Sequence, residues 1–322
     1  MDLVADSPVF DLGDSSWAAQ ASAALRRQGF VRVRLTPAEL RVVESVYDSG
    51  LRFFDDRAKW QLVVGDSAHR LWDSRSGYVG DRYREYIEMH ACNRFAMDDK
   101  HSRRGRPCER SGSSRGLGSE SGSTADAHSP SSRFLPSMQA LALQCHTRCH
   151  EALRELAGDD ASNQVGRLLA EEEAAAQRPA GEGEEETALG FECSMMRVYR
   201  YNCCYDPYEG DVHHDMGLLT MIPKSSSPGL EIQPEHGGGE WVRVEKLLGR
   251  DEAIIFGGVT LARLTGVRAL RHRIYTGGRV RISACYFQRT GPGFHFDAAP
   301  GFEAETAANY SKRIRDAREE EL

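Results

Sequence analysis

Residues 212–220 read Val-His-His-Asp-Met-Gly-Leu-Leu-Thr, and they carry the most specific signal in the chain. His213 and Asp215 are two positions apart, so on an extended strand their side chains point to the same face. A second histidine, His272, follows much later within an Arg-His-Arg segment. Two imidazoles and one carboxylate on one side of a metal leave three octahedral positions open, which is typical of non-haem iron(II). We therefore expect these three side chains to bind iron.

A possible anion-binding pair lies close to the second histidine in the sequence. Residues 281–283 read Arg-Ile-Ser, nine positions after His272, so Arg281 and Ser283 share one face of a strand. A guanidinium binds a carboxylate through two parallel hydrogen bonds, and a hydroxyl adds a third. His214 lies between two expected ligands and points to the opposite face, so it is not counted among them.

The segments around these residues predict a β-rich core that follows a mixed N-terminal region. Residues 31–35 alternate apolar residues with arginine, which indicates a half-buried strand, and residues 36–39 (Thr-Pro-Ala-Glu) form a capping box that opens a helix. From residue 191 onward, short apolar runs alternate with Gly- and Pro-containing turns, a pattern typical of a sandwich or jelly roll. The expected strands of this part are 195–201, 218–222, 230–232, 241–244, 253–256 and 281–287.

Two segments are expected to be insertions. Residues 101–133 are rich in Ser, Gly and Arg and have too few apolar side chains to order themselves, and residues 169–187 are rich in Glu, Ala and Gly. The expected division is a helical and strand region at 1–100, the first insertion at 101–133, helical support at 134–168, an acidic flexible insertion at 169–187, a jelly-roll catalytic core at 188–300 and a C-terminal helix at 301–322.

The composition of the 322 residues limits the kind of partner. The net charge is −7 and the basic residues are scattered, which argues against nucleic acid. No run of about 18 apolar residues exists to span a membrane, and the first ten residues do not resemble a secretory signal. The eight cysteines are therefore expected to be reduced thiols. These features predict a cytoplasmic monomer that acts on a small molecule.

A weaker metal signal lies in residues 145–150, which read Cys-His-Thr-Arg-Cys-His. Two cysteines at positions i and i+4 share a helix face, but nothing near them in the sequence completes a tetrahedral set. We therefore interpret residues 145–150 as one face of a helix whose two cysteines bind no metal. The three glutamates at 171–173 are most simply a solvated acidic patch.

Residues 190–290 resemble the iron(II)/2-oxoglutarate-dependent dioxygenases of the isopenicillin-N-synthase-like group. The N-terminal strand and helix before Gly29-Phe30, and the Phe53-Phe54 pair, also look like that group. The matching pieces of the C-terminal half are residues 213–220, 228–232 (Pro-Gly-Leu-Glu-Ile), 239–242 (Gly-Glu-Trp-Val), 261–266 (Leu-Ala-Arg-Leu-Thr-Gly), 272–273 and 281–283. The resemblance implies an α+β fold, with a double-stranded β-helix (jelly-roll) core and N-terminal helices packed around it.

The same resemblance implies an activity and a set of roles. The chain would couple oxidative decarboxylation of 2-oxoglutarate to hydroxylation or desaturation of a small organic substrate, with dioxygen as oxidant and ascorbate as reductant. His213, Asp215 and His272 would bind iron(II), and Arg281, Ser283 and Tyr201 would hold 2-oxoglutarate. Residues 199–202 read Tyr-Arg-Tyr-Asn where the family has Asn-x-Tyr-Pro, so Tyr199 has no assigned role. Two alternatives remain: an iron oxidase of the same fold without 2-oxoglutarate, and a non-catalytic metal-binding or sensor protein.

Two further residues are expected to bind the substrate. Arg197 shares a strand face with Tyr201, so if the tyrosine faces the cavity the arginine does too. It would then bind an anionic or phenolic substrate group, or pair with a protein carboxylate such as Glu192 or Asp211. Phe287 shares a face with Arg281 and is expected to line the same cavity and stack on a flat substrate.

Overall fold

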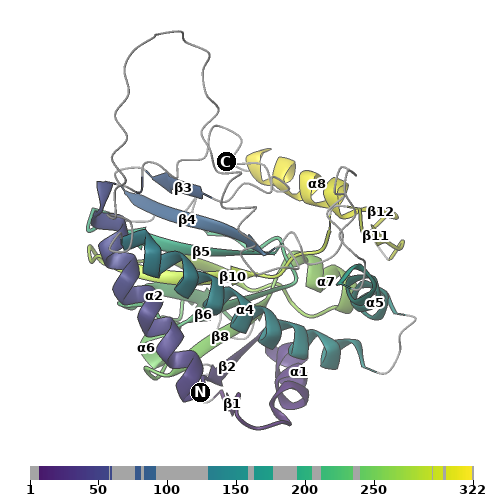
Figure 1. Ribbon diagram of the computed structural model, residues 1–322. Coiled ribbons are helices and arrows are strands. Elements are labelled where there is room, and N and C mark those ends of the chain that lie inside the picture. Colours follow the sequence, from purple (N-terminus) through teal and green to yellow (C-terminus); the bar gives the residue numbers. More distant parts are fainter. Residues whose placement is uncertain are drawn as a thin grey trace, which may run out of the picture.

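The described part of the computed structural model combines one eight-stranded β-sheet and two two-stranded β-sheets with helices on the outer side of the largest sheet (Figure 1). The residues it describes are 7–57, 59, 77–80, 83–91, 130–158, 163–176, 194–204, 212–234, 240–291, 293–299 and 302–320. None of the helices in these ranges is long and apolar enough to cross a membrane.

The N-terminal elements follow the sequence signals closely. Strand β1 (Val9–Asp11) and helix α1 (Trp17–Gln28) precede strand β2 (Phe30–Arg34), and Gly29 ends the helix in the left-handed region at φ 78°, which costs glycine little. The expected capping box is confirmed, because Thr36 and Glu39 exchange hydrogen bonds at the start of helix α2 (Pro37–Asp55).

The largest sheet has eight strands in the order β1-β2-β8-β6-β10-β5-β4-β3. Strands β5 (Ser194–Tyr201), β6 (Leu219–Pro223), β8 (Glu252–Gly257) and β10 (Arg281–Phe287) correspond to expected strands. No separate strand was expected at β3 (Gly77–Gly80) or β4 (Arg84–Ala91), which extend one edge of the sheet through β5.

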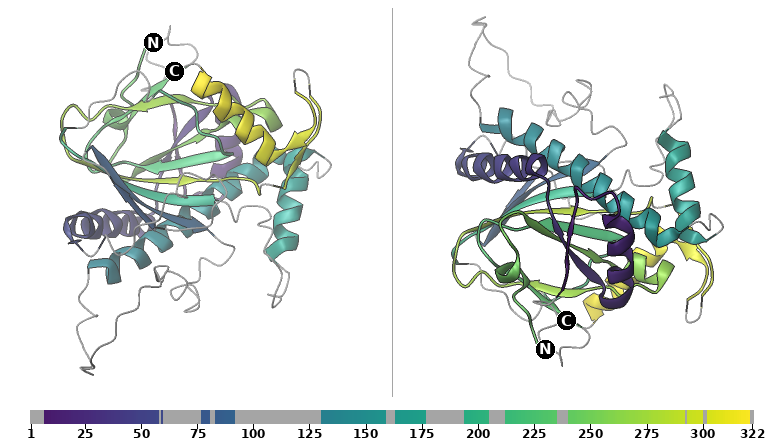
Figure 2. Two further views of the ribbon diagram at one scale, coloured as in Figure 1. Left: turned by 90° about the horizontal axis from the view of Figure 1, so that it is seen from above. Right: turned by 90° about the horizontal axis from the view of Figure 1, so that it is seen from below.

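One of the two-stranded sheets pairs β7 (Leu230–Gln233) with β9 (Arg271–Ile274). Figure 2 shows that this part lies on one side of the large sheet, whereas α2 and α4 (Pro130–Ala157) cover the other side. The expected strand at 241–244 is wrong in extent: only Val242 forms a bridge, to Ile232, and helix α6 (Val244–Leu247) begins directly after it.

Helix α4 (Pro130–Ala157) packs along α2 on the outer face of the large sheet. Phe134 of α4 meets the expected Phe53-Phe54 pair of α2, with ring centroids 4.7 Å and 6.2 Å apart respectively. Most of the first expected insertion, 101–133, lies outside the described residues. Its last residues, from Pro130, are part of α4.

The boundary of the second expected insertion is wrong. Helix α5 (Gln164–Ala176) includes the first eight residues of the segment 169–187, and the remaining residues, 177–187, lie outside the described part. Val165, Leu168 and Leu169 of α5 are buried. Burial of these apolar side chains stabilises a helix that composition alone does not predict.

The chain ends in a small β-unit and a helix. Strands β11 (His295–Phe296) and β12 (Glu305–Thr306) pair with each other. Helix α7 (Val259–Thr265) lies earlier in the chain, between β8 and β9. The helix expected at the C-terminus is α8, Ala307–Glu320.

Candidate active site

The two histidines of the expected triad are joined by the backbone. His213 and His272 form an isolated antiparallel bridge, with backbone N to O distances of 3.0 Å and 2.9 Å. Their ring centroids lie 4.3 Å apart. The Nε2 atoms of the two rings are 3.6 Å and 3.7 Å from Oδ1 of Asp215, so three ligand atoms converge on one point.

The local backbone differs from the expectation. His213 forms a single bridge rather than part of a regular strand, and Asp215 lies in the loop before β6. A Cβ at Gly217 would meet the carbonyl oxygen of Gln288 at 2.3 Å, so only glycine permits this loop to approach the end of β10. His214 is no member of this three-residue group.

Asp215 is almost fully buried and is held by a hydroxyl. Thr220 Oγ1 donates to Oδ2 of Asp215 at 2.6 Å, while Oδ1 faces the two imidazoles. Burial opposes ionisation, but the neighbouring His272 and hydrogen bonds from His213 and Thr220 outweigh it and hold the pKa of Asp215 well below its usual range. The carboxylate is therefore charged at neutral pH.

His272 is buried and neutral. Burial and the nearby His213 lower the pKa of His272 to about 4. Its Nδ1 lies 3.1 Å from the carbonyl oxygen of Leu270, which favours the tautomer with the proton on Nδ1 and a lone pair on Nε2. A neutral imidazole beside an ionised carboxylate is the protonation state that binds a metal, so the group fits a divalent cation.

Arg281 and Ser283 lie on the inner face of β10 and are both fully buried. Opposite them on β5 are Tyr201 and Tyr199, and the guanidinium of Arg281 lies 5.1 Å from the ring centroid of Tyr201. The three residues expected to hold a co-substrate are thus neighbours.

Arg281 also has a buried protein partner that the sequence did not indicate. Its Nη2 donates to Oε1 of Glu245 at 3.0 Å and to the hydroxyl of Ser225 at 2.8 Å. Glu245 accepts three backbone N–H bonds as well, from Ser225, Gly229 and Leu230. Burial opposes ionisation of Glu245, but the charge of Arg281 and these hydrogen bonds lower its pKa.

Two donors of Arg281 have no acceptor within the described part of the chain. Its Nε and Nη1 atoms are buried there without a hydrogen-bond partner. An unsatisfied buried donor of a charged group is costly, so an oxygen-rich ligand fits there. Ser283 lies 2.9 Å from Ser225, and its hydroxyl therefore belongs to the same network.

Arg197 forms an ion pair with a protein carboxylate, but with a different one from the two named as examples in the sequence analysis. It forms an ion pair with Glu88 of β4, whereas the expected partners Glu192 and Asp211 lie outside the described residues. It also donates to the hydroxyl of Tyr199 at 3.2 Å. Its guanidinium lies 5.8 Å from the ring centroid of Phe287, so the two expected substrate residues are adjacent.

Three functional neighbours of the site were missed from the sequence: Thr220, Glu245 and Glu88. Each comes from an element other than that of its partner, and no spacing rule links the pairs. The sequence shows Glu245 only as a glutamate directly after the Trp-Val-Arg-Val segment. A single acidic residue does not indicate that it will pair with a buried arginine.

Known proteins resemble this chain in part of its sequence and in its fold. No family model matches the sequence. The curated relative gibberellin 3-beta-dioxygenase 3 of Arabidopsis thaliana is 31% identical over 113 residues, which are 33% of this chain and 32% of that protein. The match thus spans about a third of the relative's length.

Solved structures resemble the whole chain. A full-length Neurospora crassa protein in complex with alpha-KG and thymine has a TM-score of 0.63 at 14% identity, and the match covers 97% of each chain. The dioxygenase for auxin oxidation in rice has a TM-score of 0.57 at 18% identity, covering 97% of this chain and 95% of its own. The dioxygenase for auxin oxidation 1 from Arabidopsis thaliana, in complex with 2-oxoglutarate, scores 0.55 at 14% identity, covering 92% and 95%. The chain therefore has the jelly-roll fold of the 2-oxoglutarate-iron(II) oxygenases, and the expected resemblance is confirmed at the level of the fold.

Proposed function

We propose that this chain is an iron(II)- and 2-oxoglutarate-dependent dioxygenase that hydroxylates or desaturates a small organic substrate. One observation carries the proposal: two imidazoles and an ionised carboxylate converge on one point, in a jelly roll that also buries an arginine with two unpartnered donors among the described residues. The solved relatives support it. The Neurospora crassa protein binds alpha-KG and thymine, and the other two are dioxygenases for auxin oxidation, one of them with 2-oxoglutarate bound.

Each protein group has a distinct part in this proposal. His213, Asp215 and His272 hold one face of the iron, and the bond from Thr220 to Oδ2 leaves Oδ1 of the aspartate for the metal. When bound, the iron supplies the reaction of dioxygen with 2-oxoglutarate that gives succinate and carbon dioxide and oxidises a substrate C–H bond. The protein holds the reactants in position and keeps the metal ligands in the protonation state that binds iron.

Arg281 binds the distal carboxylate of 2-oxoglutarate through Nη1, a donor from which no described protein group accepts. Ser225 and Glu245 accept from Nη2, the other terminal nitrogen of the guanidinium. Ser283 and Tyr201 complete the pocket for the carboxylate. A cytoplasmic monomer without membrane or nucleic-acid partners remains our prediction.

The direct test is succinate release by purified, metal-depleted protein after addition of iron(II), ascorbate and 2-oxoglutarate. Slow succinate formation that needs both iron and 2-oxoglutarate, even without substrate, is the expected result. Oxygen consumption that needs iron but not 2-oxoglutarate would favour the oxidase alternative, in which Arg281 binds the substrate's own carboxylate. Iron binding without oxygen consumption would indicate the non-catalytic alternative.

The proposed substrate contacts predict uncoupling. Phe287→Ala should lower the amount of product formed per succinate, because the substrate loses a wall of its pocket while the iron ligands and Arg281 are untouched. Arg197→Ala should do the same, but it removes the ion-pair partner of the nearly buried carboxylate of Glu88. The double variant Arg197→Ala/Glu88→Gln removes that charge and serves as the control. Product and succinate measured in parallel check this, and an equal fall of both would assign these residues to co-substrate binding.

A further inference from the structure

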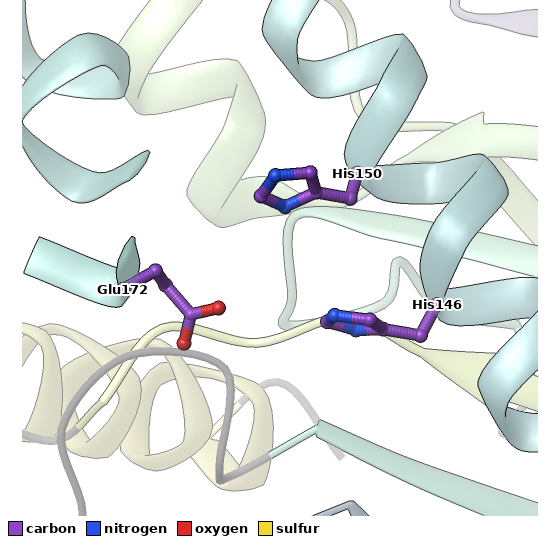
Figure 3. Close-up of side chains that lie close together, drawn as sticks. All are labelled: His146, His150 and Glu172. Atoms are coloured by element: carbon purple, nitrogen blue, oxygen red, sulfur yellow. The ribbon is translucent and has the colours of Figure 1, made fainter. Parts of the chain in front are cut away.

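A second cluster of metal-binding side chains lies outside the active site. His146 and His150 of α4 and Glu172 of α5 each offer one ligand atom, and these atoms all lie within 4.8 Å of one another. Figure 3 shows both imidazole rings and the carboxylate directed toward a common space between the two helices. The cluster contacts β10 through Tyr286, which alternates along that strand with the inward-facing Arg281, Ser283 and Phe287.

The two helices bring these residues together for simple geometric reasons. His146 and His150 are four positions apart, so they are neighbours on one face of α4. On α5, Glu172 continues the buried stripe formed by Val165, Leu168 and Leu169. Its exposed fraction is 6%, so the prediction that this glutamate belongs to a solvated patch is wrong. Burying a carboxylate at a core position is costly unless a cation or hydrogen-bond donors compensate.

Both histidines are in the form that binds metals. Burial and the neighbouring His150 lower the pKa of His146 to about 4, and burial with the charge of Arg154 lowers the pKa of His150 as well. At neutral pH the imidazoles are therefore uncharged and offer lone pairs rather than positive charge. A divalent cation would bring positive charge to the buried carboxylate, and the two imidazoles would need no deprotonation to bind it.

The protein orients at least one of the rings. Nδ1 of His146 lies 2.8 Å from the hydroxyl of Tyr286, and the two rings meet edge to face. Metal-binding histidines usually use their second nitrogen for such a contact, because it fixes the ring and its tautomer. The thiols of the same segment do not take part: Cys145 and Cys149 are fully buried, and burial raises the pKa of both.

We propose that His146, His150 and Glu172 form a second metal site, which binds Zn²⁺ with water as the fourth ligand. Two imidazoles and one carboxylate with an open fourth position are an established zinc ligand set. Zinc–ligand bonds of about 2.0–2.2 Å place tetrahedral ligand atoms about 3.4 Å apart, so side-chain shifts of about 1 Å suffice to close the site. The bound ion fastens α5 to α4, next to the outer face of β10.

A neighbouring arginine opposes the ion. Nε of Arg154 donates to Nε2 of His150 at 3.0 Å, and the same side chain pairs with Glu173. Its side chain is 56% exposed, so it can move into solvent when a cation binds. Because like charges repel, Arg154→Gln should bind Zn²⁺ more tightly than the unaltered site.

The test uses the full-length protein with the substitution Asp215→Ala, which disables the active-site triad. After treatment with a chelator, zinc uptake is measured by competition with a chromophoric chelator and by elemental analysis of the dialysed protein. One zinc ion per chain is expected, together with a rise of several degrees in the unfolding temperature.

Variants of the cluster locate the ion. Adding His150→Ala or Glu172→Gln to the Asp215→Ala protein should lower zinc affinity at least tenfold and abolish the thermal shift. Glu171→Gln is the matched control, because it removes the same charge from the exposed preceding position of α5. Glu172→Gln keeps the size of the side chain, so folding checked by circular dichroism should be retained. The proposal is overturned if the Asp215→Ala protein takes up no zinc, or if uptake is the same in all of these variants.

Discussion

His213→Ala, Asp215→Ala and His272→Ala are each expected to abolish 2-oxoglutarate turnover. Replacement of an outer partner of a metal ligand already costs about 10–100-fold in metal affinity or activity, so loss of a ligand itself should exceed that range. Asp215 supplies the only carboxylate of the group, and its Oδ1 lies within 3.7 Å of both imidazoles. Iron content and succinate release, measured on the same preparations, check the expectation.

His214→Ala is the matched control for the triad variants. It removes an imidazole between two of the proposed ligands, yet His214 does not belong to the convergent group. Most of the iron and most of the activity should be retained. Full activity of the Asp215→Ala protein would refute the assignment of the iron site.

Arg281→Lys is expected to raise the KM for 2-oxoglutarate by about 10- to 150-fold. This corresponds to the loss of one charge-assisted hydrogen bond, about 1.5–3 kcal/mol, because an ammonium cannot reproduce the planar guanidinium. Initial rates of succinate release against 2-oxoglutarate concentration give the value. An unchanged KM would indicate that this residue binds the substrate instead.

Glu245→Gln tests whether the ion pair of Glu245 with Arg281 contributes to stability, to 2-oxoglutarate binding or to both. It removes the buried countercharge of Arg281 and keeps the side-chain size, so the protein without 2-oxoglutarate should unfold at a lower temperature. The KM for 2-oxoglutarate should not rise, because Glu245 contacts Nη2 and the proposed ligand binds Nη1. A large increase in KM would show that the ion pair is needed to position the arginine.

The fold was predictable where local chemistry determines it. Gly29 ends α1 in the left-handed region, and Thr36 with Glu39 starts α2, because each signal acts within a few residues. The strands that carry Arg281 and Tyr201 were predicted for the same reason: a short apolar run between turn residues is a local property of the chain.

Strand β4 was missed because its buried acids conceal the apolar pattern. Glu85 and Glu88 are buried, and in the sheet they lie opposite Arg200 and Arg197, with which they form ion pairs. A buried charge on a strand reads as a solvent-facing residue until its cross-strand partner is known. That partner is more than a hundred positions away in the chain.

The residues of the proposed iron site were identifiable from the amino-acid sequence, because a His-x-Asp spacing, a later histidine and an Arg-x-Ser segment are recognisable without coordinates. The partners of those residues became known only from the packing of the chain. The pair of Glu245 with Arg281 and the meeting of Glu172 with His146 each join separate elements. Such pairs depend on how whole helices and strands pack, so no local spacing in the sequence encodes them. Burial strengthens the electrostatic interaction within each pair.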